Sequence, residues 1–299
     1  RIGILLGIYF IIDNWRKNGI TIKKINMITI TFLGYFMLLT PTLMRSRLLH
    51  YDNFSHWALI VKYLLTQQAL PDVNSTIIGF SSYPIGTSLW CYYFVNFVGF
   101  NDGVMIFAQF CLLMACLYAM VAVIKDKNNV LTFAVMFLVM TVFNYFNIAI
   151  RMNNLLVDYV LPLLTLAAIA SIFFYRKNVY FMATMTICLT SVLGIVKNNS
   201  LFFAMIVLGY FLLTVIKYRD KKWPLGKKAL LILGTMTASM APYLLWLWHV
   251  HQTFGQQLSK HEISVTVYHD IYEAKTPEII SAIVQKFWHH LITLSTIPT

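Results

Sequence analysis

This 299-residue sequence has few charged residues: only 11% are charged, whereas 59% are hydrophobic. Soluble domains carry about 25% charged and about 45–50% apolar residues, so a soluble fold of this length could not bury so much apolar surface. Apolar runs of about 20 residues recur, the length that a helix needs to cross a bilayer. The alternating polarity of membrane-spanning strands is missing. The sequence therefore predicts an all-α, polytopic membrane helix bundle.

Acidic residues are also scarce, since 11 Asp and Glu stand against 23 Lys and Arg, a formal net charge of +12. Basic chains often bind nucleic acid, but these cations gather in short loops between apolar runs, as membrane topology requires. We therefore expect membrane lipids as partners and no nucleic acid. The four cysteines show no metal-ligand spacing, and we expect them to be small core or lipid-facing side chains.

Seven apolar segments are predicted to span the membrane. Their connecting loops set the orientation, because Lys125–Asn129, Arg176–Lys177 and Lys217–Lys228 are basic and are expected in the cytoplasm. The predicted spans cover residues 25–44, 104–124, 130–150, 157–175, 179–196, 200–216 and 229–249.

With those loops inside, the stretch from Arg45 to Gly103 and the turn from Arg151 to Asp158 are expected outside. The apolar segment Pro84–Phe100 then lies between two outside loops. Its length of about 16 residues is marginal for a span. Because it is rich in aromatics, we predict an interfacial or re-entrant helix on the outer surface. The alternative, a true span, would reverse every later helix and break the positive-inside pattern three times.

The composition changes after His249, which predicts two regions. Residues 1–250 are expected to form a transmembrane module, truncated at its N-terminus because the chain begins at Arg1 without Met. Residues 251–299 are expected to form an outside loop, rich in His and acids, and the start of a further helix, spanning or amphipathic. The segment from His249 to Asp270 is either a gate or acceptor contact for a site or a polar cap over the bundle, and we favour the cap.

Four ionisable residues are predicted where the chain meets the outer side of the membrane: Asp52, Arg151, Asp158 and Lys197. Each has a structural explanation, since Asp52 suits a helix N-cap, Arg151 is placed to pair with Asp158, and Lys197 suits an ordinary loop. A carboxylate such as Asp158 at the start of a span is nevertheless costly unless it is paired or functional. Their convergence on one face predicts a common polar site.

Three more side chains near this face are candidates for ligand binding. His56 follows Asp52 by one helical turn, and we consider a divalent metal ion held by Asp52, His56 and Asp158, with a solvated His56 as the alternative. Arg45 and Arg47 suit an anionic phosphate ligand. The alternative is that they extend to lipid headgroups.

The order of elements resembles the GT-C glycosyltransferases, polyprenyl-phosphate-sugar-dependent membrane enzymes that include the aminoarabinose transferases and protein O-mannosyltransferases. In that family the first span leads to an outside acid, matched by Asp52, and to juxtamembrane helices with a Pro–aromatic segment, matched by SYPIGTSLWCYYF from Ser82 to Phe94. A basic turn, a second outside acid and a later lysine follow, matched by Lys125–Lys127, Asp158 and Lys197.

The resemblance covers about residues 25–250 and implies a GT-C-like fold with juxtamembrane helices in a large first outside loop. It implies transfer of a hexosyl or pentosyl group from a polyprenyl-phosphate donor to a hydroxyl of a glycan, glycolipid or protein. Asp52 would be the general base, Asp158 would orient the acceptor or a cation, and inversion is expected. The donor phosphate would contact Lys197, Arg151, Arg45, Arg47, Tyr83 and His56. Asn53 stands where the family commonly has a second acid.

Three alternative functions remain open. The protein could be a transporter or flippase of lipid-linked glycans, a polymerase or ligase of such glycans, or a non-catalytic scaffold. A transporter would have ionisable residues near mid-bilayer, where this sequence has almost none. The sequence therefore favours surface chemistry. Its richness in Ile, Lys, Asn, Phe and Tyr is typical of AT-rich bacterial genomes, so we expect a multi-pass protein of a bacterial cell membrane with an extracytoplasmic site.

Overall fold

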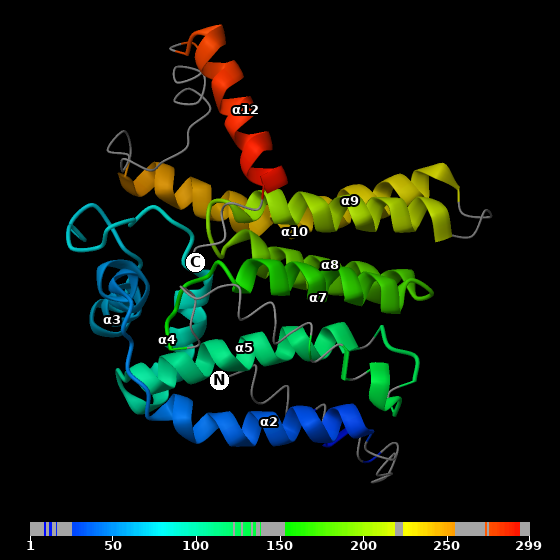
Figure 1. Ribbon diagram of the computed structural model, residues 1–299, viewed down its shortest axis with the longest axis horizontal. Coiled ribbons are helices and arrows are strands. Elements are labelled where there is room, and N and C mark those ends of the chain that lie inside the picture. Colours follow the sequence, from blue (N-terminus) through cyan, green and yellow to red (C-terminus); the bar gives the residue numbers. More distant parts are fainter. Residues whose placement is uncertain are drawn as a thin grey trace. The chain divides into compact units, whose positions relative to one another are not determined.

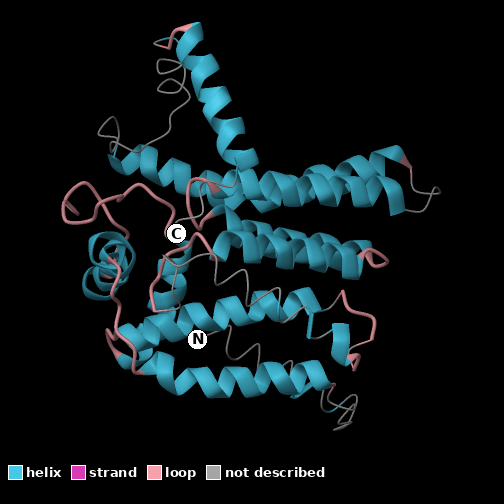
Figure 2. Cartoon of the chain, in the orientation of Figure 1, coloured by secondary structure: helices cyan, strands magenta, loops and turns pink. Residues whose placement is uncertain are grey.

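The computed structural model is entirely helical in its regular structure, with no strand among the residues that it describes (Figure 2). This confirms the all-α prediction. The chain divides into two compact units, residues 1–253 and 254–299. The described residues are 9, 12–13, 16, 26–121, 123–126, 128–132, 134–135, 138, 153–218, 224–254, 273 and 275–293.

Four helices in the described part of the chain are long and apolar enough to cross a membrane. Mean hydropathy over their most apolar windows runs from 1.6 to 2.3. This supports a multi-span membrane protein. The four are α2 (Met27–Met44), α5 (Asp102–Val121), α9 (Ser200–Tyr218) and α10 (Leu225–Phe254).

Two further apolar helices, α7 (Val160–Tyr175) and α8 (Val179–Gly194), coincide with predicted spans but have only 16 residues each. At 1.5 Å per residue each is about 24 Å long, short of the hydrocarbon core, so their role as spans stays a prediction. α7 contacts α5, α8 and α9 and buries ten of its residues, which makes it the centre of the core. Most of the predicted span at 130–150 lies outside the described residues.

Local sequence explains where the helices begin. α2 follows Asn26, whose side chain accepts a hydrogen bond from the amide of Thr29, and α8 follows Asn178, which accepts from the amide of Phe181. Asparagine is a preferred N-cap because its side-chain oxygen satisfies an amide that has no partner within the helix.

The chain between α2 and α5 forms three short helical elements at one end of the bundle: the π-helical turn η1 (Asn53–Trp57), α3 (Ala58–Gln67) and α4 (Gly86–Val98). Figure 1 shows α4 running across the direction of α5 and α3 seen end-on, whereas α2, α5 and α7–α10 run side by side. At 13 residues, α4 is too short to span. It lies crosswise, as an interfacial helix would, where the sequence predicts one.

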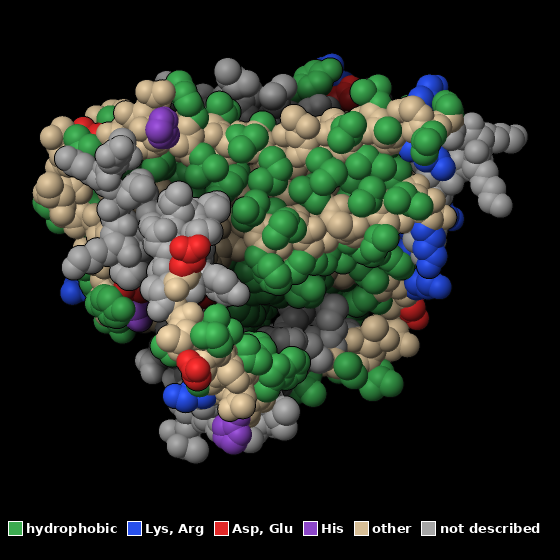
Figure 3. Space-filling view, turned by 90° about the horizontal axis from the view of Figure 1, so that it is seen from above, with side chains coloured by type: hydrophobic (Ala, Val, Ile, Leu, Met, Phe, Trp, Pro, Cys, Tyr) green, Lys and Arg blue, Asp and Glu red, His purple; other side chains and the backbone are tan. Residues whose placement is uncertain are grey.

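The basic connections lie at the opposite end of the bundle. The turn between α7 and α8, the C-terminal end of α9 and the N-terminal end of α10 all lie there (Figure 1), and Figure 3 shows Lys and Arg side chains gathered at that end. Lys217, Lys227 and Lys228 lie on the ends of α9 and α10 rather than in a loop, because both helices are longer than predicted. Exposed apolar side chains such as Leu213 and Leu233 cover these helices, as expected of lipid-facing surfaces.

The second unit contains α12 (Pro277–Thr293). Its exposed apolar residues recur at helical spacing, as Ile279, Ile283 and Phe287 do, and the opposite face of the helix carries Glu278, Ser281 and Gln285. It is therefore an amphipathic helix, and it is not among the candidate spans.

At the close contact between α2 and α5, we expect a single added methyl group at Gly103 to lower the stability of the protein. A Cβ on Gly103 would overlap the carbonyl oxygen of Met44 and approach its Cα to 3.0 Å, and both contacts are with backbone, which cannot rotate away. We expect Gly103→Ala to destabilise the protein by about 1–3 kcal/mol, measured as the thermal midpoint in detergent. Gly209→Ala in α9, where nothing lies within 4 Å, is the matched control and should be neutral or stabilising. Equal midpoints for the two variants would contradict this.

Candidate functional site

The two predicted outside acids are carried by segments that meet at the α3–α4 end of the bundle. Buried Asn53, next to Asp52, accepts a hydrogen bond through Oδ1 from the amide of Leu155 at 2.9 Å. This bond joins η1 to residues 153–158, the segment that ends in Asp158. Both acids therefore lie at the same end of the molecule, although Asp52 and Asp158 share no direct contact here.

Gln109 of α5 also forms hydrogen bonds with residues 153–158. Its Nε2 donates to the carbonyl oxygens of Asn154 at 3.0 Å and Leu156 at 3.3 Å. Sequence reasoning missed both Asn53 and Gln109. A signal was present, because an amide in an apolar run such as that around Gln109 must find hydrogen-bond partners within the membrane.

Asp158 pairs with Lys197, whose Nζ lies 3.0 Å from Asp158 Oδ1. Lys197 lies in the turn between α8 and α9, which is closed by a hydrogen bond from the amide of Ser200 to the Lys197 carbonyl oxygen and another from Ser200 Oγ to Gly194. The side chains of Lys197 and Asp158 are 24% and 47% exposed. The pair is thus open to a ligand. The expected partner Arg151 lies outside the described residues.

His56 is buried, not solvated as the alternative interpretation had it. It is only 2% exposed, and the rings of Trp57, Phe80 and Tyr83 surround it at centroid distances of 4.4, 5.5 and 5.7 Å. Both ring nitrogens lack a hydrogen-bond partner. Burial and, second, the charge of Lys197 lower the pKa of His56 from 6.5 to about 4. His56 is therefore neutral at pH 7 and lies within electrostatic reach of Lys197.

This burial predicts a pH dependence of stability. The unfolded chain takes up a proton on His56 below about pH 6.5, but the folded protein does so only near pH 4. Stability must therefore fall as the pH decreases between these values, by an amount on the order of 3 kcal/mol. We expect His56→Phe, which keeps the aromatic packing, to flatten the thermal midpoint between pH 7 and pH 4.5.

The control for that experiment is His50→Gln, because His50 is 29% exposed and lies on the same loop. Its pH profile should follow the wild type. A His56→Phe profile that also follows the wild type would show that His56 titrates normally in the folded protein.

Asp52 precedes η1, but its side chain caps no amide there, so the structural explanation proposed for it does not hold. Its own amide donates to His50 Nδ1 at 3.3 Å. The same nitrogen lies 3.6 Å from Asp52 Oδ2. The Asp52 side chain is 27% exposed and keeps its accepting capacity for another group.

The remaining predicted site residues are Tyr83, Arg45 and Arg47. Tyr83 is half-buried and stacks on Phe80, with ring centroids 4.9 Å apart. Arg45 and Arg47 follow α2 and are exposed. From α10, Trp246 Nε1 donates to the Ser82 carbonyl oxygen at 3.0 Å, so this helix covers the loop before α4. The predicted gate or cap from His249 to Asp270 begins within α10, and its residues 255–270 lie outside the described residues.

A metal ion has no ready ligand set among the described residues, in which no three His, Cys, Asp or Glu side chains are grouped to hold one. Asp158 engages a lysine, and His56 faces aromatic rings. With Asp52 they do not form the oxygen-rich or imidazole-rich cluster that divalent cations prefer.

No known protein family matches the sequence, and no curated protein or solved structure is significantly similar to the chain. The resemblance to GT-C enzymes therefore depends on the order of the sequence elements. The chemistry of the site must be argued from its own geometry.

Proposed function

We propose that this protein is a membrane glycosyltransferase that moves a sugar from a polyprenyl-phosphate donor to an acceptor hydroxyl. The observation that supports this best is the partly exposed Lys197–Asp158 pair beside the neutral, buried His56. A fixed cation at the membrane end of a helix bundle suits a lipid phosphate, whose hydrocarbon chain stays in the bilayer. The reaction site would be extracytoplasmic, since the basic turns lie at the other end of the bundle.

Binding requires Lys197 to exchange Asp158 for the donor phosphate. A partly exposed ion pair contributes only about 0–1 kcal/mol, so this exchange costs little. His56 adds no positive charge of its own at neutral pH, so Lys197 is the cation that the described residues place beside Asp158. Asp158, released from the lysine, can then accept a hydrogen bond from a sugar or acceptor hydroxyl.

Transfer is a single displacement. Asp52 takes the proton of the acceptor hydroxyl as its oxygen forms a bond to the anomeric carbon. The bond from that carbon to the phosphate oxygen breaks, and its electron pair leaves with the lipid phosphate. Lys197 stabilises the negative charge that develops there. One displacement inverts the anomeric configuration.

The test is an assay of the purified chain in lipid nanodiscs with a panel of polyprenyl-monophosphate sugars and glycan, glycolipid and peptide acceptors. We expect release of polyprenyl phosphate together with a glycosylated acceptor, and inversion seen by NMR of the product. Turnover of diphosphate-linked oligosaccharides alone would indicate a polymerase instead. Movement of the lipid-linked sugar across a vesicle membrane without transfer would indicate a flippase. Either result would refute the proposal.

A further inference from the structure

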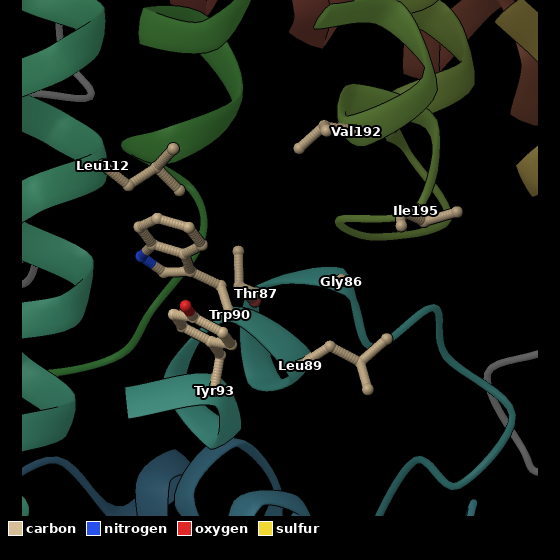
Figure 4. A pocket seen from close by; sticks show the side chains of 8 residues that line it. All are labelled: Gly86, Thr87, Leu89, Trp90, Tyr93, Leu112, Val192 and Ile195. Carbon is tan, nitrogen blue, oxygen red and sulfur yellow. The ribbon is translucent and has the colours of Figure 1, made fainter. Parts of the chain in front are cut away.

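An apolar pocket with a volume of about 480 Å³ lies between the crosswise helix α4, the middle of α5 and the end of α8. Figure 4 shows Trp90 and Tyr93 on α4 beneath Leu112 of α5, with Val192 and Ile195 across the opening. The lining residues are Gly86, Thr87, Leu89, Trp90, Tyr93, Leu112, Val192 and Ile195.

The walls of the pocket are held in place by hydrogen bonds that point away from it. Trp90 Nε1 donates to the carbonyl oxygen of Ala108 at 2.6 Å, so the indole presents its apolar face to the pocket with its polar atom already satisfied. The amide of Gly86 donates to the Ile195 carbonyl oxygen at 2.7 Å. A Cβ on Gly86 would also lie 2.7 Å from that oxygen, so glycine permits this close approach.

The mouth of the pocket is formed by partly exposed apolar side chains, the kind of surface that faces lipid in a membrane protein. Leu89, Trp90, Tyr93 and Val192, which line it, are each between 37% and 43% exposed. Leu112 lies ten residues into α5, which places it about 15 Å along a candidate span. A hydrocarbon chain can therefore enter directly from the bilayer.

The pocket and the ion pair share one turn of the chain. Ile195 forms part of the wall, and two residues later Lys197 binds Asp158. A ligand in the pocket would thus have its polar end beside the lysine. A single chain that ends in a phosphate fits both features, whereas a neutral lipid would leave the lysine unused.

We infer that this pocket binds the phosphate-proximal part of the hydrocarbon chain of a single-chain lipid phosphate, with the phosphate at Lys197. The inference rests on the proposed function and adds to it where the donor's chain lies. At about 30 Å³ for each group of the size of a methylene or a water, the pocket holds about sixteen such groups, or about three isoprene units. The rest of a long chain remains in the bilayer.

Photolabelling of the full chain in nanodiscs tests this, with a farnesyl phosphate probe that carries a diazirine on its chain. We expect adducts on the pocket residues, and competition by unlabelled farnesyl phosphate but not by inorganic phosphate. Val192→Trp and Leu112→Trp fill the pocket and should weaken probe binding by about tenfold or more. Leu213→Trp on exposed α9 is the matched control, and Val192→Ala, which enlarges the pocket, should retain labelling.

Three results would overturn the inference: labelling of Val192→Trp as strong as that of the wild type in a folded protein, adducts only outside the pocket, or equal competition by a two-chain phospholipid. The last would show an ordinary bilayer lipid in the pocket. Specific labelling without sugar transfer from any donor would refute the proposed function and leave the pocket assignment standing. Transfer that survives in Val192→Trp would refute the pocket assignment alone.

Discussion

Replacement of Asp52 by Asn is expected to lower the rate of sugar transfer by about 10²–10⁴-fold, because an amide cannot take the proton of the acceptor hydroxyl. The size and shape of the side chain are kept. The side chain of Asp52 caps no helix, and its contact with His50 Nδ1 at 3.6 Å is partly exposed, so the carboxylate contributes little to the stability of the fold. The measurement is the single-turnover rate with a saturating polyprenyl-phosphate sugar.

The matched control is Asp72→Asn, a carboxylate on the same long connection between α2 and α5. Asp72 makes local hydrogen bonds with Ser75, Asn74 and Tyr63, which lower the pKa of its carboxyl group, and so it has a structural role. That variant should transfer sugar at close to the wild-type rate. If Asp52→Asn also did so while remaining folded and inserted, Asp52 could not be the base.

Composition and apolar run length predicted most of the helices, because the bilayer imposes the same requirement on every spanning segment. The helices α2, α5, α9 and α10 each coincide with a predicted apolar run that is long enough to span a bilayer. Local signals set where helices begin, as Asn26 does for α2. Run length alone overestimated α7 and α8, because residues 157–159 and 195–196 lie in the connections beside these helices. Those connections are where the candidate site lies.

The partners of the site residues could not be predicted in the same way, because they come from distant parts of the chain. The bond from Leu155 to Asn53 joins residues 102 positions apart, and the Lys197–Asp158 pair joins residues 39 positions apart. Helical periodicity also gave no indication that His56 would be enclosed by Phe80 and Tyr83, which lie in an irregular connection. The sequence predicts which end of the bundle carries the polar groups, but only tertiary packing sets their pairing.

Loss of the cation at position 197 is expected to lower the transfer rate by about 10²–10³-fold, the effect of removing one fixed group that stabilises developing negative charge. Lys197→Met keeps much of the side-chain length and removes the charge, whereas Lys197→Arg should retain part of the activity. The readouts are the transfer rate and the affinity for polyprenyl phosphate without sugar. Both should fall in Lys197→Met, because the phosphate contacts the same group before and after transfer.

A charge-swapped variant, Lys197→Asp combined with Asp158→Lys, separates this role from a structural one. The swap restores an ion pair between the same two positions, and since the native pair is partly exposed, the free energy of unfolding should return to within about 1 kcal/mol of the wild type. In this variant, however, the lysine is at position 158, just before α7, and no longer in the α8–α9 turn that lines the pocket. Stability should therefore recover while transfer stays low. Recovery of both would mean that the pair only ties α7 to the α8–α9 turn, and the phosphate would need another cation.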